Sequence, residues 1–196
     1  MSNRVKEFHN IQPIENVPSI LKLGLLSFYQ AQKHRHLSIA RDDIQKKRDE
    51  KIIPGGLPLH QYASLYFDAR NPMMYRRCNE RKDLCVLKIS KSVDEIENVV
   101  FSDQNASSDY ARFYSPEEGY ERLNFDLIYA ADWRHLNNRV MYYIHSSTKC
   151  AEVLIPNLLP PQYIKSIYTS DENMRQYVKR LCPNINVEIN PYLFFK

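Results

Sequence analysis

Short apolar runs, separated by polar and charged segments, form the main pattern of this chain and predict its strands. The runs are rich in Val, Ile and Tyr, which favour extended backbone. They fall at 84–90, 99–102, 152–156, 164–169 and 186–190. An aromatic stretch at 59–67 and a shorter segment at 7–12 are read as further strands. Together these segments predict one mixed β-sheet.

Helical patterns lie between the predicted strands. Apolar residues recur with helical spacing from position 17 to 25, and Gly24 is a typical C-terminal stop. Ser38 can cap a second helix over 39–50, which carries few apolar residues and therefore belongs on the surface. The segment 71–75 predicts a helix start. Helices beside a mixed sheet place the chain in the α+β class.

Composition narrows the class of protein. The 196 residues, 43% hydrophobic and 26% charged, predict one compact domain over 1–196 with a substantial core. No run is long enough to span a bilayer and the N-terminus lacks a signal-peptide core, so a cytoplasmic protein is expected. Four glycines leave no room for a P-loop or a GxGxxG cradle. The four irregularly spaced cysteines match no zinc pattern and are expected as free thiols.

Positive charge is clustered although the net charge is only +4. The clusters lie at 33–35, 41–51, 76–82 and 134–139. Such clusters permit contacts with nucleic-acid phosphates, and they are also common as plain solvated faces.

Several separated motifs stand in a familiar order along nearly the whole chain. They are Ile-Glu-Asn-Val-Pro-Ser-Ile-Leu at 14–21, Gly-Leu-Leu at 24–26, Ser-Ile-Ala at 38–40 with Ile-Gln at 44–45 and Arg48, Pro-Gly-Gly at 54–56, Leu-His-Gln-Tyr at 59–62, Tyr-Phe at 66–67, Asn-Pro-Met-Met-Tyr at 71–75, Val-Phe-Ser-Asp at 100–103 and Ala-Glu-Val-Leu-Ile at 151–155. Each is weak alone. In this joint order they resemble the DarT family, toxins that attach ADP-ribose to nucleic acid.

The resemblance implies a compact ADP-ribosyltransferase fold, in which a split, strongly bent mixed sheet with peripheral helices surrounds an NAD cleft. Glu152 matches the family's catalytic glutamate and Arg48 its catalytic arginine. The chemistry agrees, because a carboxylate beside the ribose stabilises the positive charge that develops as nicotinamide leaves. Arg48 can orient phosphates or the acceptor base. Considered without the motifs, Glu152 would be a solvated strand-edge residue and Arg48 part of an exposed salt-bridged face.

The same resemblance implies the NAD contacts. They are assigned to His9, Asn10, Gln12, Leu26, His60 and Tyr66. This chain departs from the family at the first strand, where Asn10 and Gln12 stand in place of the usual His and Thr and His9 is displaced by one residue. Gln61 also replaces the customary Asp. For His9 and His60 a structural role is an equal alternative, and aromatics such as Tyr66 are often plain core. NAD serves as substrate, and no metal is implied.

The stretch 133–149 precedes Glu152 at the position of the loop by which ADP-ribosyltransferases recognise their acceptor. Its mixture of aromatic and cationic residues suits single-stranded nucleic acid, since bases stack on rings while cations hold phosphates. We assign Arg139, Tyr143, His145 and Lys149 to nucleic-acid binding, and add Arg70 and Arg76 near the pocket. Buried aromatics beside an ordinary basic loop are the alternative.

Together with these residues, the resemblance to the DarT family implies an NAD-dependent toxin that modifies a base in single-stranded DNA, countered by a macrodomain antitoxin. The departures at Asn10, Gln12 and Gln61, and Ala63-Ser64 in place of the usual Val-Pro, favour guanine over thymine. Transfer to RNA or to protein is the rival reading. Cys150, two residues before Glu152, disfavours arginine modification. A catalytically inactive nucleic-acid-binding module is the alternative from another class.

Overall fold

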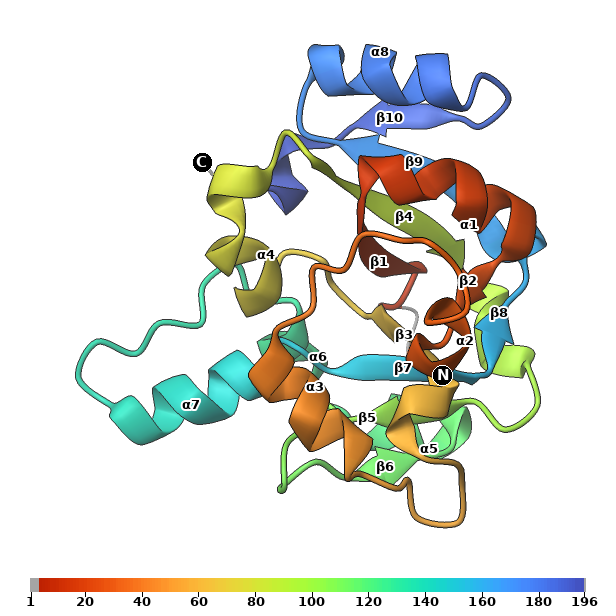
Figure 1. Cartoon of the computed structure of the whole chain (residues 1–196). Helices are drawn as coiled ribbons and strands as arrows, with labels where there is room; N and C mark the ends of the chain where they lie inside the picture. The colour runs from red at the N-terminus through yellow and green to blue at the C-terminus, as the bar shows by residue number, and fades with distance from the viewer. Residues whose placement is uncertain (1–3, 196) are drawn as a thin grey trace.

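The computed structural model describes residues 4–195 and is built around a central sheet (Figure 1). The strands are β1 (Glu7–Pro13), β3 (Tyr62–Tyr66), β4 (Leu84–Ser90), β5 (Val100–Ser102), β6 (Phe113–Tyr114), β7 (Glu152–Pro156), β9 (Ile164–Thr169) and β10 (Val187–Ile189). Their order in the sheet is β10-β9-β4-β1-β3-β7-β5-β6. β10 pairs with β9 in parallel and the other pairs are antiparallel. β2 (Leu25–Leu26) and β8 (Leu158–Leu159) form a separate ribbon. The predicted α+β class and mixed sheet are confirmed.

The sheet splits between β1 and β3. β1 pairs with β4 along its whole length, from Glu7 opposite Ser90 to Pro13 opposite Leu84. It meets β3 only where His9 lies opposite Tyr66. Beyond that point the two strands diverge, and the side chains of the second half of β1 lie at the opening.

Helices surround the sheet. They are α1 (Val17–Leu23), α2 (Phe28–Ala31), α3 (Asp42–Asp49), α4 (Pro72–Arg76), α5 (Pro116–Arg122), α6 (Phe125–Ile128), α7 (Arg139–Thr148) and α8 (Glu172–Leu181), with 3-10 turns η1 (Ile14–Asn16), η2 (Leu59–Gln61), η3 (Cys78–Glu80), η4 (Lys91–Glu95), η5 (Pro161–Tyr163) and η6 (Pro191–Leu193). α7 and the loop before it extend away from the body of the molecule (Figure 1). In the described part of the chain, no helix has both the length and the apolar character needed to cross a membrane.

Apolar side chains fill both faces of the sheet, which explains why its strands are read as nearly continuous apolar runs. Phe8, Phe67 and Phe101 meet edge to face on one side, with ring centroids 5.1 to 5.9 Å apart. Ile11 and Met74 belong to a second cluster on the other side. All four cysteines are free thiols, as expected.

Several predicted boundaries need correction. The surface helix begins at Asp42 with Arg41 at its N-cap, because the Ser38 hydroxyl accepts from the Ala40 amide in a local turn instead of capping the helix. The predicted strand 59–67 opens with the 3-10 turn η2 and becomes a strand only at Tyr62. Helix α1 ends at Leu23, just before Gly24, as predicted, and Gly24 has φ +90°.

The segment 133–149, expected as a loop, contains the ten-residue helix α7. Asn138 caps it by accepting from the Met141 amide at 2.9 Å. Asp171 caps the unpredicted α8 in the same way, through the Met174 amide. Both caps follow an ordinary sequence signal, an Asn or Asp just before a helix-forming stretch.

Candidate active site

Glu152 is the first residue of β7 and its side chain is 1% exposed. Its backbone N–H donates to the Ser102 hydroxyl on the neighbouring β5 at 3.0 Å. Its Oε1 accepts from the backbone N–H of Ala106 at 2.9 Å. The carboxylate is therefore held in one orientation, and the alternative of a solvated strand-edge residue is wrong.

Arg48 reaches this carboxylate from α3. Its Nη1 lies 3.1 Å from both Oε1 and Oε2 of Glu152, and its Nη2 donates to the Ser64 hydroxyl at 2.6 Å. The Arg48 side chain is 12% exposed, so the ion pair is largely shielded from water. Charges paired in such a setting interact more strongly than exposed ones. The structure thus brings together two predicted residues that are 104 positions apart, and Ser64 joins them without having been predicted.

Tyr66 lies directly opposite Glu152 in the β3–β7 pair, on the same face of the sheet. Burial raises the pKa of its phenol far above the ordinary value, and the charge of Glu152 raises it further. The side chain is therefore a neutral hydrogen-bonding group beside the carboxylate. Its position places the ring next to the carboxylate of Glu152.

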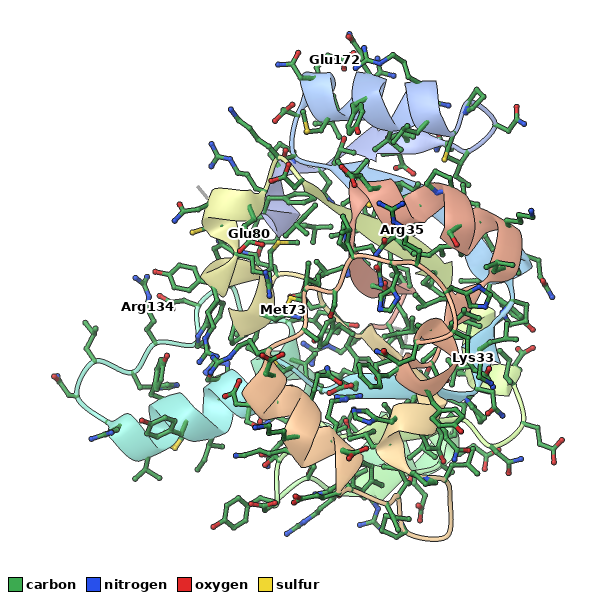
Figure 2. All side chains as sticks on the ribbon, viewed as in Figure 1. Lys33, Arg35, Met73, Glu80, Arg134 and Glu172 are labelled. Atoms are coloured by element: carbon green, nitrogen blue, oxygen red, sulfur yellow. The ribbon has the colours of Figure 1, made fainter. Side chains whose placement is uncertain are left out.

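A cavity of 190 Å³ opens at the far end of β1, between α1, β2 and the segment 31–40. Gln12 and Leu26, two of the predicted NAD contacts, line it. Arg35 also lines it and lies close to α1 (Figure 2). The lining combines apolar groups with amides and cations, a mixture typical of nucleotide sites.

A chain of side-chain amides connects this cavity to β3. Asn10 donates to the Ser64 carbonyl at 2.9 Å, Gln12 donates to Asn10 at 2.9 Å, and Asn16 donates to Gln12 at 3.2 Å. Asn16 also bonds both the N–H and the C=O of Leu37, at 3.0 and 2.8 Å. Sequence reasoning missed Asn16, although its motif at 14–21 was noticed. Ser64 and Asn16 mark the two ends of this chain.

His9 and His60 do not line the cavity. His9 accepts from the Ala69 amide at 3.0 Å and contacts Glu7 at 2.9 Å, so both ring nitrogens are occupied within the protein. His60 contacts Asp49 and Gln45 of α3. Burial lowers the pKa of His60, with the Arg48 charge adding to the effect and Asp49 opposing it. The contacts of both histidines are thus with other parts of the protein, which is the arrangement expected of a structural role.

A family model described as "ssDNA thymidine ADP-ribosyltransferase, DarT" matches residues 9–195. The chain belongs to the DarT family. A curated relative, the DNA ADP-ribosyl transferase-DNA ADP-ribosyl glycohydrolase fusion protein of Thermosipho africanus, is 28% identical over 206 residues, which cover 100% of this chain and 51% of the relative. The chain therefore spans about half the length of that protein.

Solved structures share the fold. Thermosipho africanus DarTG in complex with ADP-ribose matches with a TM-score of 0.84 at 27% identity, over 97% of this chain and 51% of that one. Thermus sp. 2.9 DarT in complex with ADP-ribosylated ssDNA gives 0.82 at 23% identity and 97% coverage of both chains. The same protein in complex with NAD+ gives 0.78 at 20% identity and 100% coverage of both. At these lower identities the Thermus structures establish the shared DarT fold.

The residues assigned to nucleic acid in this DarT chain fall into two groups. Arg76, Arg139 and Tyr143 are exposed, and Arg139 lies over the Tyr143 ring at 5.5 Å. Arg134 projects from the loop that leads to α7 (Figure 2). These groups can meet a flexible nucleic-acid strand.

The other three assigned residues are occupied within the protein. Lys149 is fully buried and pairs with Asp68 at 2.7 Å. His145 is buried between His135 and the Leu127 carbonyl. Arg70 is stacked against the rings of Tyr192 and Phe195. Lys149 and His145 are buried, whereas Arg70 is half-buried and its Nε has no hydrogen-bond partner. Within residues 4–195 no cluster of His, Cys, Asp and Glu is arranged to hold a metal.

Proposed function

We propose that this protein transfers ADP-ribose from NAD+ to a base in single-stranded DNA and releases nicotinamide. The observation that carries the proposal is the shielded Glu152–Arg48 pair, held by Ser64 and the Ala106 amide beside the opening of the split sheet. The family description and the bound groups of the related structures support the same reaction.

Glu152 acts in both halves of the reaction. As the bond between ribose C1′ and the nicotinamide nitrogen breaks, its carboxylate stabilises the positive charge on the sugar. Nicotinamide leaves as a neutral molecule, and a base nitrogen attacks C1′ from the opposite face, with inversion. Glu152 accepts the proton that this nitrogen loses and later returns it to solvent.

Arg48 orients this carboxylate by contacting both of its oxygens. Its second amino group, bound to Ser64, fixes the plane of the guanidinium. Once a ligand enters, the same planar group can donate to a phosphate or a base oxygen without changing its own charge.

NAD+ extends from Glu152 towards the cavity at the end of β1. Gln12 and Leu26 contact the part of the dinucleotide that enters the cavity, while Asn10 holds Gln12 in place. Tyr66 walls the nicotinamide end. NAD+ is consumed as a substrate.

Single-stranded DNA reaches Glu152 along the face formed by α4 and α7, where Arg76, Arg139 and Tyr143 are exposed. The target base is the finer part of the proposal. We keep guanine, on the basis of Asn10, Gln12 and Gln61, against the thymidine named in the family description. If the product carries ADP-ribose on thymidine, thymidine becomes the target base and the proposed transfer reaction is unchanged.

The biological role follows from the same reaction. Modified bases block replication, so the protein acts as a toxin, and a macrodomain antitoxin that removes ADP-ribose is its partner. The fused glycohydrolase of the Thermosipho africanus relative supports this partner. We further propose that residues 1–196 form one domain, since a single sheet takes strands from Glu7 to Ile189.

The test incubates the protein with labelled NAD+ and, in parallel, single-stranded DNA, duplex DNA, RNA and mixed protein. Label is expected on single-stranded DNA alone, and Glu152→Gln lowers the rate by about 10²- to 10⁴-fold. Glu117→Gln, an exposed carboxylate on α5, serves as the matched control and keeps full activity. Mass spectrometry of the product identifies the base. Label on RNA or protein overturns the substrate, and no label on any acceptor favours an inactive binding module.

A further inference from the structure

His60 joins the 3-10 turn η2 to α3. Its Nδ1 lies 3.1 Å from Asp49 Oδ1, and its Nε2 lies 2.9 Å from Gln45 Oε1. Phe28 of α2 stacks on the imidazole at 4.2 Å with an interplanar angle of 27°. His60 is only 8% exposed. Its ring contacts one stacked ring and two side chains of α3.

α3 has few other anchors. None of its residues is buried, and most of its side chains are charged. Arg48 and Asp49 follow Gln45 by three and four positions, so both lie on the same side of the helix as Gln45. On that side Arg48 meets Glu152 and Ser64, while Gln45 and Asp49 flank His60, with the Asp49 side chain 79% exposed.

The chain on either side of α3 is anchored separately. Arg77 donates to the Ile39 carbonyl before the helix, and the Leu59 amide donates to the Lys51 carbonyl after it. These contacts hold the two ends of the segment, but they do not by themselves restrict rotation of α3 about its own axis. Gln45 and Asp49 are one helical turn apart, so a ring bound to both resists that rotation.

We propose that His60 is a positioning residue, which fixes the orientation of α3 and thereby places the Arg48 guanidinium against Glu152. This replaces the assignment of His60 to NAD contact. Both ring nitrogens are engaged with α3, one face of the ring is covered by Phe28, and the residue is absent from the cavity lining. The role deepens the proposed function, because it rests on Arg48 and Glu152 performing the transfer.

The first measurement is amide hydrogen exchange in the free protein, which needs no substrate. His60→Leu replaces the stack on Phe28 by an apolar contact of similar size and removes both polar contacts, so protection of residues 42–49 is expected to fall about tenfold. His60→Asn retains a group at the position of Nδ1 that can bond Asp49, and is expected to recover most of the protection. Glu50→Gln, an exposed change at the end of α3, is the matched control and leaves the exchange rates as in the wild type. Unchanged exchange in His60→Leu overturns the proposal.

The second measurement separates positioning from NAD contact. In His60→Leu, kcat is expected to fall about 10- to 100-fold, because a misplaced catalytic group loses rate. The KM for NAD+ is expected to stay within about threefold, since neither His60 nor Arg48 lines the cavity. Partial recovery of kcat in His60→Asn supports the proposal. A raised KM with unchanged kcat returns His60 to the NAD contacts.

Failure of the proposed function gives a different pattern. A wild-type protein without transferase activity would refute the reaction, while the exchange result would still report whether His60 holds α3. Loss of exchange protection in His60→Leu with full kcat would refute the catalytic consequence alone.

Discussion

At the scale of single residues, the site depends on side chains that bond to backbone as well as to each other. Glu152 is oriented by the Ala106 amide on one oxygen and by Arg48 on both. A backbone donor cannot change its rotamer, so this arrangement is organised before any ligand enters. Ser64 also combines a side-chain and a backbone contact, because its hydroxyl is bound to Arg48 and its carbonyl is bound to Asn10.

Glu7 is a second residue whose charge is set by its surroundings. Burial alone would raise the pKa of Glu7, but hydrogen bonds from His9 and Tyr168, together with the charge of Lys88, outweigh it and lower the pKa to about 2. The ordinary value is 4.5. The folded state therefore favours the ionised form more than the unfolded state does.

This difference predicts the pH dependence of stability. The contribution of Glu7 is fully present above about pH 4.5 and is lost as the pH falls towards 2, because only the unfolded state gains the proton in that window. Glu7→Gln is expected to remove about 2 kcal/mol of unfolding free energy at pH 7 and to flatten the slope between pH 4.5 and 2. Urea titrations at a series of pH values measure both. Parallel pH profiles for the two proteins would contradict the assignment.

At the scale of elements, the segment from Leu37 to Asp49 covers the site with little apolar anchoring. The sequence predicted that 33–48 is mobile without NAD and nucleic acid, because few of its residues are apolar. That remains a prediction. The structure adds the polar contacts through which it docks, Asn16 on Leu37 at one end and His60 on α3 at the other.

Asn16→Leu tests the first of these contacts. The change removes both bonds to Leu37, so exchange across 34–40 is expected to accelerate about tenfold. Because this segment lines the cavity, the KM for NAD+ is expected to rise by about the same factor, while kcat changes little. Asn173→Leu, an exposed position on α8, is the control. A lower kcat with an unchanged KM would show that Asn16 serves Arg48 and Glu152 instead of the cavity.

At the scale of the whole molecule, one buried ion pair connects three parts of the chain. Lys149, between α7 and β7, donates to Asp68 after β3 at 2.7 Å and to the Ile128 carbonyl of α6 at 2.8 Å. Its side chain has no exposed surface. This cation therefore fixes the entry of the chain into β7, three residues before Glu152.

Lys149→Met leaves the Asp68 carboxylate without its cation in a largely buried place. The unfolding free energy is expected to fall by about 3 to 5 kcal/mol. Arg175→Met breaks an exposed pair with Glu172 on α8 and is expected to cost much less, because water screens an exposed pair. Chemical denaturation of the two variants gives the comparison. Equal losses would mean that the buried pair contributes no more than a surface one.

The sequence by itself determined the local elements and the family. Apolar runs located β4, β7 and β9, and Gly24 marked the end of α1 because its φ of +90° is unfavourable for other residues. The ordered motifs identified DarT and singled out Glu152 and Arg48. Boundaries at Ser38 and Leu59 failed because side-chain turns and 3-10 geometry compete locally with helix and strand.

Only the tertiary structure decided which candidate residues meet. Lys149 and Arg139 are equally basic in the sequence, yet one is fully buried and the other exposed. His60 contacts α3 and does not line the cavity. Ser64 and Asn16 belong to the site, although the sequence did not predict either of them. These outcomes depend on strand order and on contacts between segments tens of residues apart, which short-range patterns do not encode.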